Sequence, residues 1–142
     1  MPATLESLAR TRSFARVIGP FLVVVIGALE VRTAEMGKFV QLFFQNDLIV
    51  WIMATVLVFA GLLIIAFHQY WSRPSAVVIS LLGWFVLLRG LLLLYAPQLM
   101  ERAIRAAVSG DQSVLYVRLG AGVMLLAGLW LTYVGWIAKP AA

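Results

Sequence analysis

The sequence predicts an all-α fold: a four-transmembrane-helix bundle made of two parallel-repeat hairpins with short amphipathic interfacial connectors. Three observations predict it: four apolar spans, a composition of 63% hydrophobic and 12% charged residues with a mean hydropathy of +1.00, and a match between the two halves of the chain. A soluble domain of 142 residues could not bury so much apolar surface. We therefore expect a membrane protein in contact with the lipid bilayer.

The spans divide a single membrane domain, residues 1–142. Leu48–Phe67 and Leu119–Ala138 carry no charge over the ~20 residues that a helix needs to cross a hydrocarbon core of ~30 Å. Ala76–Pro97 is as long and carries one charge, Arg89, while the first span, Val17–Leu29, is shorter. The predicted parts are a cytoplasmic N-terminus at 1–16, a first half at 17–67, a loop at 68–75 and a second half at 76–138.

Two amphipathic connectors join the spans within each half. In Glu35–Gln45 the apolar residues recur at i, i+3, i+4 and i+7, and in Gln98–Ser109 the apolar residues oppose the charged ones. Each pattern predicts a short helix lying in the membrane surface, with a loop or an extended stretch as the alternative.

The two halves match when the chain is shifted by 64 residues without a gap. This shift places Gly19 on Gly83 and Asp47 on Asp111. Because each half contains two spans, the repeat is parallel, and its pseudo-twofold axis is expected along the membrane normal. Pro74 ends the second helix and permits a short turn between the halves.

Small residues recur along two spans and indicate where helices pack. They are Ala121, Gly128 and Gly135 on the fourth span, and Ala76, Ser80, Gly83 and Gly90 on the third. In lipid, where apolar burial does not drive association, small residues let backbones approach for van der Waals contact. A pore-lining stripe is the alternative.

Composition argues against several functional classes. The chain has no Cys, which removes disulfides, thiolate catalysis and cysteine-ligated metals. The spans hold no metal-ligand cluster, nucleophile elbow or paired carboxylate, so we expect no enzyme, no metal and no cofactor. The formal charge of +5 reflects Arg and Lys at helix ends and connectors, where they reach lipid headgroups, and not nucleic-acid binding.

Arg89, Arg118 and Glu30 form a candidate polar site inside the membrane. Arg89 lies ~12 Å along its helix from Pro97, and Arg118 lies ~9 Å from Gln112, at a rise of ~1.5 Å per residue. An arginine at the centre of a span is unfavourable by about 2.5–3.5 kcal/mol, so it should have a partner. We hypothesise that Glu30 pairs with Arg89 across the halves. The alternatives are contact with lipid phosphate or a backbone carbonyl, or a functional anion or headgroup site.

His68, Tyr70 and Trp71 follow the second span. A histidine beside two aromatic residues at the end of a helix is typical of the aromatic belt at a membrane interface. A haem ligand or a proton relay is the alternative for His68, although haem needs a second ligand and a relay needs a chain of partners.

Short motifs along the chain are similar to those of a known family. They are His68–Trp71 (His-x-x-Trp), Gly83-Trp84, Arg89-Gly90 and Pro97, with Arg16–Gly19 and Arg118–Gly120 in the first and fourth spans. Over about residues 14–136 the chain resembles a family of small, uncharacterised bacterial integral membrane proteins. The resemblance implies four helices in a bacterial cytoplasmic (inner) membrane and implies no activity.

These features favour a non-enzymatic membrane protein that serves as an interaction or accessory subunit of a membrane assembly, with a membrane-protein partner or by self-association. The alternative is a small homo-oligomeric transporter or channel for a small or anionic solute, because parallel repeats and buried arginines also suit a solute pathway. An enzyme acting on lipid is the third hypothesis, and no nucleophile and base support it.

The arginines before the first span predict that both termini and the loop after the second span are cytoplasmic. The connectors should then face outward. Because the chain has no Cys, single cysteines at Ser72 and Ser109 can be labelled with an impermeant maleimide in intact cells. We expect labelling at Ser109 and protection at Ser72, and the opposite pattern would reverse the orientation.

Overall fold

The fold is all-α, as predicted. The computed structural model describes residues 4–71, 73–108 and 111–138, and these contain no strand. The helices are α1 (Leu5–Val31), α2 (Met36–Phe44), α3 (Asp47–Phe67), α4 (Pro74–Tyr95), α5 (Pro97–Val108) and α6 (Asp111–Thr132), with a 3₁₀ turn at Thr33–Glu35 and a π-helical turn at Tyr133–Ile137. Helices α1, α3, α4 and α6 are long and apolar enough to cross a membrane, so the chain is a multi-pass membrane protein.

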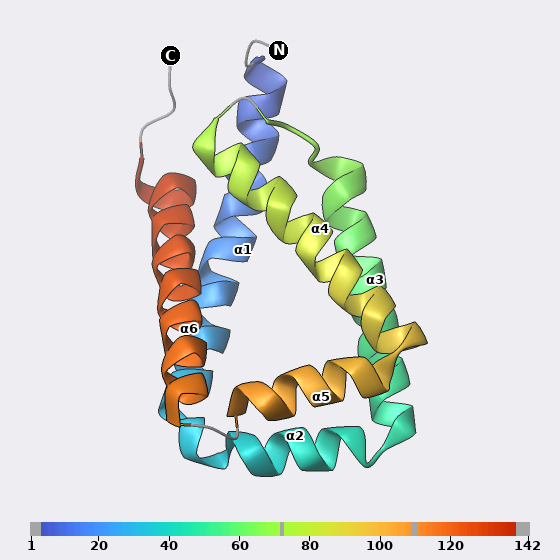
Figure 1. Cartoon of the computed structure of the whole chain (residues 1–142). Coiled ribbons are helices and arrows are strands. Elements are labelled where there is room, and N and C mark those ends of the chain that lie inside the picture. The colour runs from blue at the N-terminus through green and yellow to red at the C-terminus, as the bar shows by residue number, and fades with distance from the viewer. Residues whose placement is uncertain (1–3, 72, 109–110, 139–142) are drawn as a thin grey trace.

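The four spans form two pairs, α1 with α6 and α3 with α4 (Figure 1). The pairs meet at the end of the molecule that holds both termini and the α3–α4 connection, and they lean apart toward the other end. There α2 and α5 lie side by side across the opening. Both predicted connector helices are therefore confirmed, and they lie at one end of the bundle.

Each pair combines a span from one half with a span from the other. Within the described residues, α1 makes its extensive contacts with α6 and not with α3, and α4 makes its own with α3 and not with α6. The two hairpins are consequently open. A shift of 64 residues carries α1 onto α4 and α3 onto α6, so it exchanges the two pairs as a twofold axis would.

The pairs are held by close backbone contact at glycines. A Cβ atom at Gly19 would lie 2.5 Å from the backbone N of Thr132, and one at Gly61 would lie 2.6 Å from the backbone N of Leu87. The small residues predicted to face a neighbour on α4 are buried, namely Ala76, Ser80, Gly83 and Gly90. Packing, and not a pore, therefore explains the small-residue stripe of the third span.

Helix α1 is longer than predicted. It begins at Leu5 instead of Val17, because Thr4 and Ser7 form a reciprocal capping box and the following residues favour a helix. Pro20 lies inside α1, where its missing N–H leaves the carbonyl of Arg16 without its helical donor. The indole Nε1–H of Trp136 donates to that carbonyl at 3.2 Å. Packing against the end of α6 thus compensates the proline.

The two ends of the bundle have separate cores. At the terminus end, Ala15, Ile79 and Leu131 are fully buried and Ile64 packs against them, so all four spans contribute. At the connector end, the core consists of residues from α3 and α4, with side chains of α2 and α5 packed on it. Among the residues whose burial is described, none from α1 or α6 belongs to that second core, which is consistent with the pairs leaning apart.

Gly61→Ala should destabilise the protein, because the added methyl group would meet the backbone of α4 at 2.6 Å. Overpacking of this kind is unfavourable by about 1–3 kcal/mol. The control is Gly122→Ala, where nothing lies within 4 Å and alanine is the better helix former. Thermal unfolding in detergent should therefore show a lower midpoint for Gly61→Ala only; equal midpoints would contradict the close contact.

Candidate functional site

His68 lies directly after α3 and its side chain is fully buried. This differs from the predicted belt position, in which the imidazole would face lipid headgroups. The neighbouring Trp71 is exposed, as a belt residue should be, and Tyr70 is half-buried. The imidazole is buried because the chain turns back after Phe67 and places it between α1 and α4.

Two hydroxyl groups contact the two ring nitrogens of His68. Nε2 lies 3.0 Å from Oγ1 of Thr11 on α1, and Nδ1 lies 3.3 Å from Oγ of Ser80 on α4. The rings of Phe14 and Tyr70 meet the imidazole edge-on, with centroid distances of 5.3 and 5.4 Å. Polar contacts and aromatic walls therefore enclose the ring on several sides.

The hydroxyl partners define which protonation states the site accepts. Thr11 donates its own proton to the carbonyl of Ser7 at 2.7 Å, so its oxygen accepts from Nε2–H of His68. Ser80 can donate to the carbonyl of Tyr70 at 3.0 Å or to Nδ1. A neutral ring is thus fully satisfied, and an imidazolium would also find an acceptor at each N–H.

Burial decides between these states. Removing the charged ring from water lowers the pKa of His68 below its ordinary value of 6.5, and a hydrogen bond to the backbone of His68 only partly opposes this effect. The neutral form is therefore the resident form at neutral pH. Thr11 lies on α1, Ser80 on α4 and His68 in the connection between α3 and α4, so the cluster is a polar crosslink between α1 and α4.

The sequence did not reveal the two partners of His68. The hydropathy pattern places Thr11 in the N-terminal segment at 1–16, and the small-residue stripe of the third span indicates helix packing for Ser80. The available signal was the hydroxyl group of Ser80 on the buried face of an apolar span, where a polar atom needs a partner. Within the described residues no group of three or more His, Cys, Asp or Glu side chains lies together, so no metal ligand set accompanies the histidine.

The structure does not bring Arg89, Arg118 and Glu30 together. Both arginines are exposed, and Glu30 is half-buried near the end of α1. In the described part of the chain the ion pairs are local ones within helices or at helix ends, namely Arg10–Glu6, Arg32–Glu35 and Arg105–Glu101. The hypothesised Glu30–Arg89 pair is not formed, because α1 and α4 belong to helix pairs that lean apart at this end.

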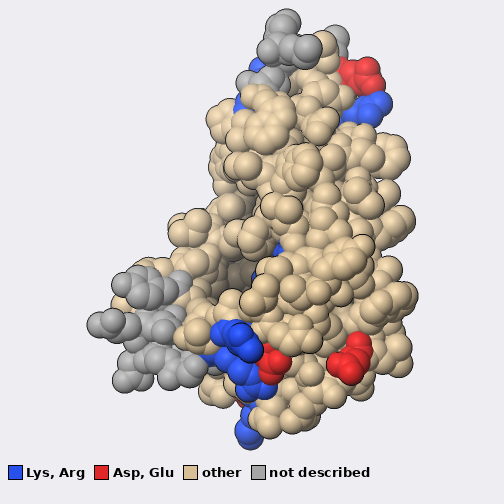
Figure 2. Space-filling view, turned by 45° about the vertical axis from the view of Figure 1, so that its right-hand side comes forward, with Lys and Arg blue, Asp and Glu red and all other residues tan. Residues whose placement is uncertain are grey.

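Arg89 instead lines an open hollow of about 270 Å³ with Phe85, Leu88 and Leu92 of α4 and Met100 of α5. The space-filling view shows a hollow near the middle of this face with Lys or Arg atoms at its edge (Figure 2). The lining places the positive charge of Arg89 among apolar side chains of α4 and α5.

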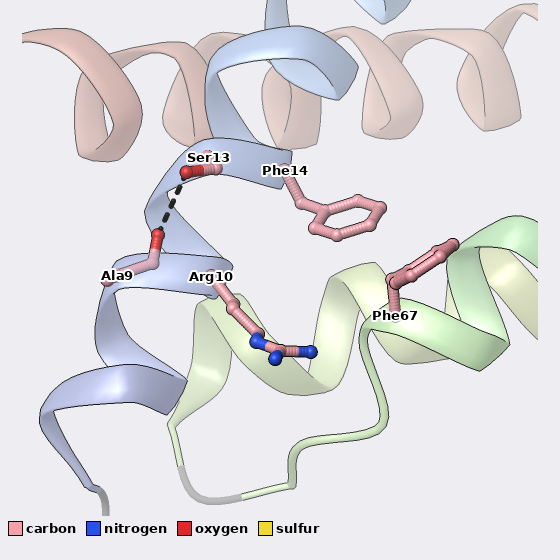
Figure 3. Close-up of a pocket in the computed structure, with 5 residues that line it drawn as sticks. All are labelled: Ala9, Arg10, Ser13, Phe14 and Phe67. Atoms are coloured by element: carbon pink, nitrogen blue, oxygen red, sulfur yellow. Dashed lines mark hydrogen bonds between the residues drawn. The ribbon is translucent and has the colours of Figure 1, made fainter.

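A second hollow, of about 390 Å³, lies at the terminus end between α1 and the end of α3. It is lined by Ala9, Arg10, Ser13, Phe14 and Phe67, and the two phenylalanine rings approach each other across it (Figure 3). Its polar groups already have partners within α1. Arg10 pairs with Glu6 at 2.7 Å, and the hydroxyl of Ser13 donates to the carbonyl of Ala9 at 3.1 Å.

Arg12 and Arg16 have a structural role beside the topological one predicted for them. Both donate through Nε to the carbonyl of Gly135, at 3.0 and 2.9 Å, and Arg12 also reaches the carbonyl of Ala138 at 2.8 Å. Gly135 belongs to the π-helical turn that follows α6, and Ala138 is the residue directly after that turn, where backbone oxygens lack helical donors. The arginines therefore cap α6 from α1.

Comparisons of the chain with family models, with curated proteins and with solved structures gave no match. The function is therefore inferred from the residues and their geometry.

Protonation of His68 should destabilise the fold at acidic pH. Since its pKa is lowered in the folded state, the unfolded chain binds more protons below pH 6.5, and stability is lost as the pH falls through that value. Unfolding midpoints measured in detergent from pH 8 to about pH 5 should decrease for the wild type. His68→Gln should remove this component of the pH dependence, and an unchanged profile in the variant would assign it elsewhere.

Proposed function

We propose that the chain is a non-enzymatic membrane protein that acts as an interaction or accessory subunit of a membrane assembly. The proposal rests on one observation: only a small fraction of the residues in each span is buried by the rest of the chain. In the apolar windows of the four spans, between 11% and 28% of the residues are buried. The two helix pairs thus leave long helical faces for lipid or for partner helices.

Unused small residues support a partner helix. Nothing lies within 4 Å of a Cβ atom built at Gly27 on α1 or at Gly120 and Gly122 on α6, in contrast to the glycines at the α1–α6 and α3–α4 contacts. In lipid, small residues favour helix association because they allow close backbone approach. These glycines lie toward the connector end, where the pairs lean apart.

A binding role also fits the chemistry of the buried groups. His68 is the buried titratable side chain within the described residues, and hydroxyl groups that are themselves bound to backbone carbonyls contact both of its nitrogens. None of the described hollows includes it. A general base must reach its substrate, and His68 does not face one of these hollows.

The second candidate is a small homo-oligomeric transporter or channel for a small or anionic solute. The observation that favours it is the exposure of Arg89 and Arg118, which lie in the connector half of their spans without an ion pair in the described part of the chain. The exchange of helix pairs by the 64-residue shift also suits an internal parallel repeat, as in many transporters.

The remaining proposals concern where the protein acts. We place it in the inner membrane of a bacterium with both termini in the cytoplasm. The resemblance to the bacterial four-helix family and the arginines before the first span support this placement.

Native mass spectrometry after mild extraction from the native membrane tests the proposed function. An accessory subunit should be recovered with a second protein in fixed stoichiometry. Gly122→Leu should weaken that association at least about tenfold, which corresponds to ~1.4 kcal/mol, because the new side chain fills a free glycine face. Gly37→Leu is the matched control, since Gly37 is also open but lies on α2 outside the spans.

Two results would contradict this proposal. A symmetric homo-oligomer without a second protein, together with anion flux in reconstituted vesicles, would favour the transporter. Equal recovery of the partner with Gly122→Leu and with the wild type would remove the free glycine face as the interface.

A further inference from the structure

Arg89 carries a positive charge within a membrane span and has no anionic partner in the described part of the chain. Arg89 precedes Tyr95, the end of α4, by six residues, which is ~9 Å along the helix. Its side chain is exposed, and within the described residues it forms no hydrogen bond or ion pair. A charged group at the bilayer centre is unfavourable by about 2.5–3.5 kcal/mol; Arg89 lies between the centre and the interface, where the penalty is smaller and is relieved when an anion meets the guanidinium.

The surroundings of Arg89 specify what kind of anion fits. Phe85, Leu88 and Leu92 share one face of α4 with Arg89, at helical spacings of three and four residues, and Met100 of α5 closes the hollow. Phe85 lies ~15 Å from the end of α4, close to the bilayer centre, whereas Met100 belongs to the interfacial helix. The wall therefore runs from the headgroup region to the middle of the membrane, with one cation near its outer part.

The open shape of the hollow favours a lipid over an enclosed solute. It has a volume of about 270 Å³ and is open on one side, whereas pockets for small molecules bury most of the ligand surface. An amphiphile that places its phosphate on Arg89 and one acyl chain along Leu88 and Phe85 needs no enclosure, because the rest of the molecule stays in the bilayer.

The hollow at the terminus end provides the contrast. It also combines an arginine with phenylalanine side chains, but Glu6 neutralises Arg10 at 2.7 Å. Arg89 has no such carboxylate in the described part of the chain. The two hollows therefore differ in net charge, and only the one at α4 and α5 presents a free guanidinium.

We propose that Arg89 binds the phosphate of an anionic phospholipid, whose acyl chain lies along Leu88 and Phe85 between α4 and α5. The guanidinium of Arg89 complements the charge of the phosphate, and the apolar side chains extend toward the bilayer centre as an acyl chain does. The inference does not depend on the accessory role proposed above, since a lipid at this site suits a subunit and a transporter equally.

The test uses the full chain reconstituted in nanodiscs of equimolar phosphatidylglycerol and phosphatidylcholine. After transfer to mild detergent, native mass spectrometry counts the lipids that stay bound. The wild type should retain phosphatidylglycerol in preference to phosphatidylcholine, and Arg89→Gln should lower that preference at least about tenfold, or ~1.4 kcal/mol. Arg73→Gln removes the same charge from the exposed loop at the other end and should leave the preference unchanged.

A second variant protects the test against misfolding of Arg89→Gln. Leu92→Glu places a carboxylate three residues after Arg89, which is the spacing of the Arg32–Glu35 ion pair, on a residue that is exposed. The new carboxylate should neutralise the guanidinium and abolish the preference for phosphatidylglycerol while the charge of Arg89 remains.

Three results would overturn the proposal. One is equal retention of phosphatidylglycerol by Arg89→Gln and the wild type, and another is equal retention of both lipids by the wild type. The third is displacement of the bound lipid from the wild type by inorganic phosphate, which would identify a site for a free anion.

Discussion

Close backbone contact at glycine is the interaction on which the architecture depends. Apolar surface gains nothing by leaving lipid for another apolar surface, so spans associate where atoms pack closely and polar groups find partners. The contact of Gly19 with Gly128 and that of Gly83 with Ile64 both meet this condition, and a shift of 64 residues carries one pair of positions onto the other. Close contacts in the two pairs of spans therefore occur at positions that lie 64 residues apart in the sequence.

The α1–α6 contact shows how packing and polar satisfaction support each other. Pro20 would weaken an isolated helix because it removes a hydrogen bond. Here Trp136 supplies the missing donor to Arg16, while Arg12 and Arg16 satisfy the carbonyl of Gly135 at the end of α6. Each irregularity lies opposite a group that compensates it. A change at this contact therefore affects the middle of α1 and the end of α6 at once.

The sequence predicts much of this fold because helices in lipid follow local rules. Span length, connector amphipathicity and the small-residue faces depend on residues near one another in the chain, and the structure has all three. The open hairpins were not predicted, since the periodicity of a helix does not specify which helix it pairs with. The start of α1 differs from the prediction for another reason. Hydropathy indicates which residues lie in the membrane, whereas the capping box at Thr4 and Ser7 indicates where the helix begins.

The candidate site was less predictable because it depends on long-range geometry. His68 was singled out, but its burial results from contacts with Thr11 and Ser80, which lie 57 and 12 residues away along the chain. The expected Glu30–Arg89 pair is not among the ion pairs of the described residues, and the expectation that an arginine in a span needs a partner stays a prediction. A match between the two halves of the sequence does not give the distance between two residues in the fold. Because the helix pairs lean apart at the connector end, Glu30 lies away from Arg89.

The two ends of the molecule are therefore suited to different roles. At the terminus end, all four spans share a core, and the His68 cluster links α1 and α4 with directional hydrogen bonds, so several independent contacts hold this end together. At the connector end, α2 and α5 bridge helix pairs that share no core among the described residues. The glycines without a close neighbour (Gly27, Gly120 and Gly122) and Arg89 also lie at this end. Ligand sites are drawn from the less stable parts of a structure because binding has to supply missing contacts there. A lipid or a partner helix that fills the connector end would contribute the contacts that the chain itself omits.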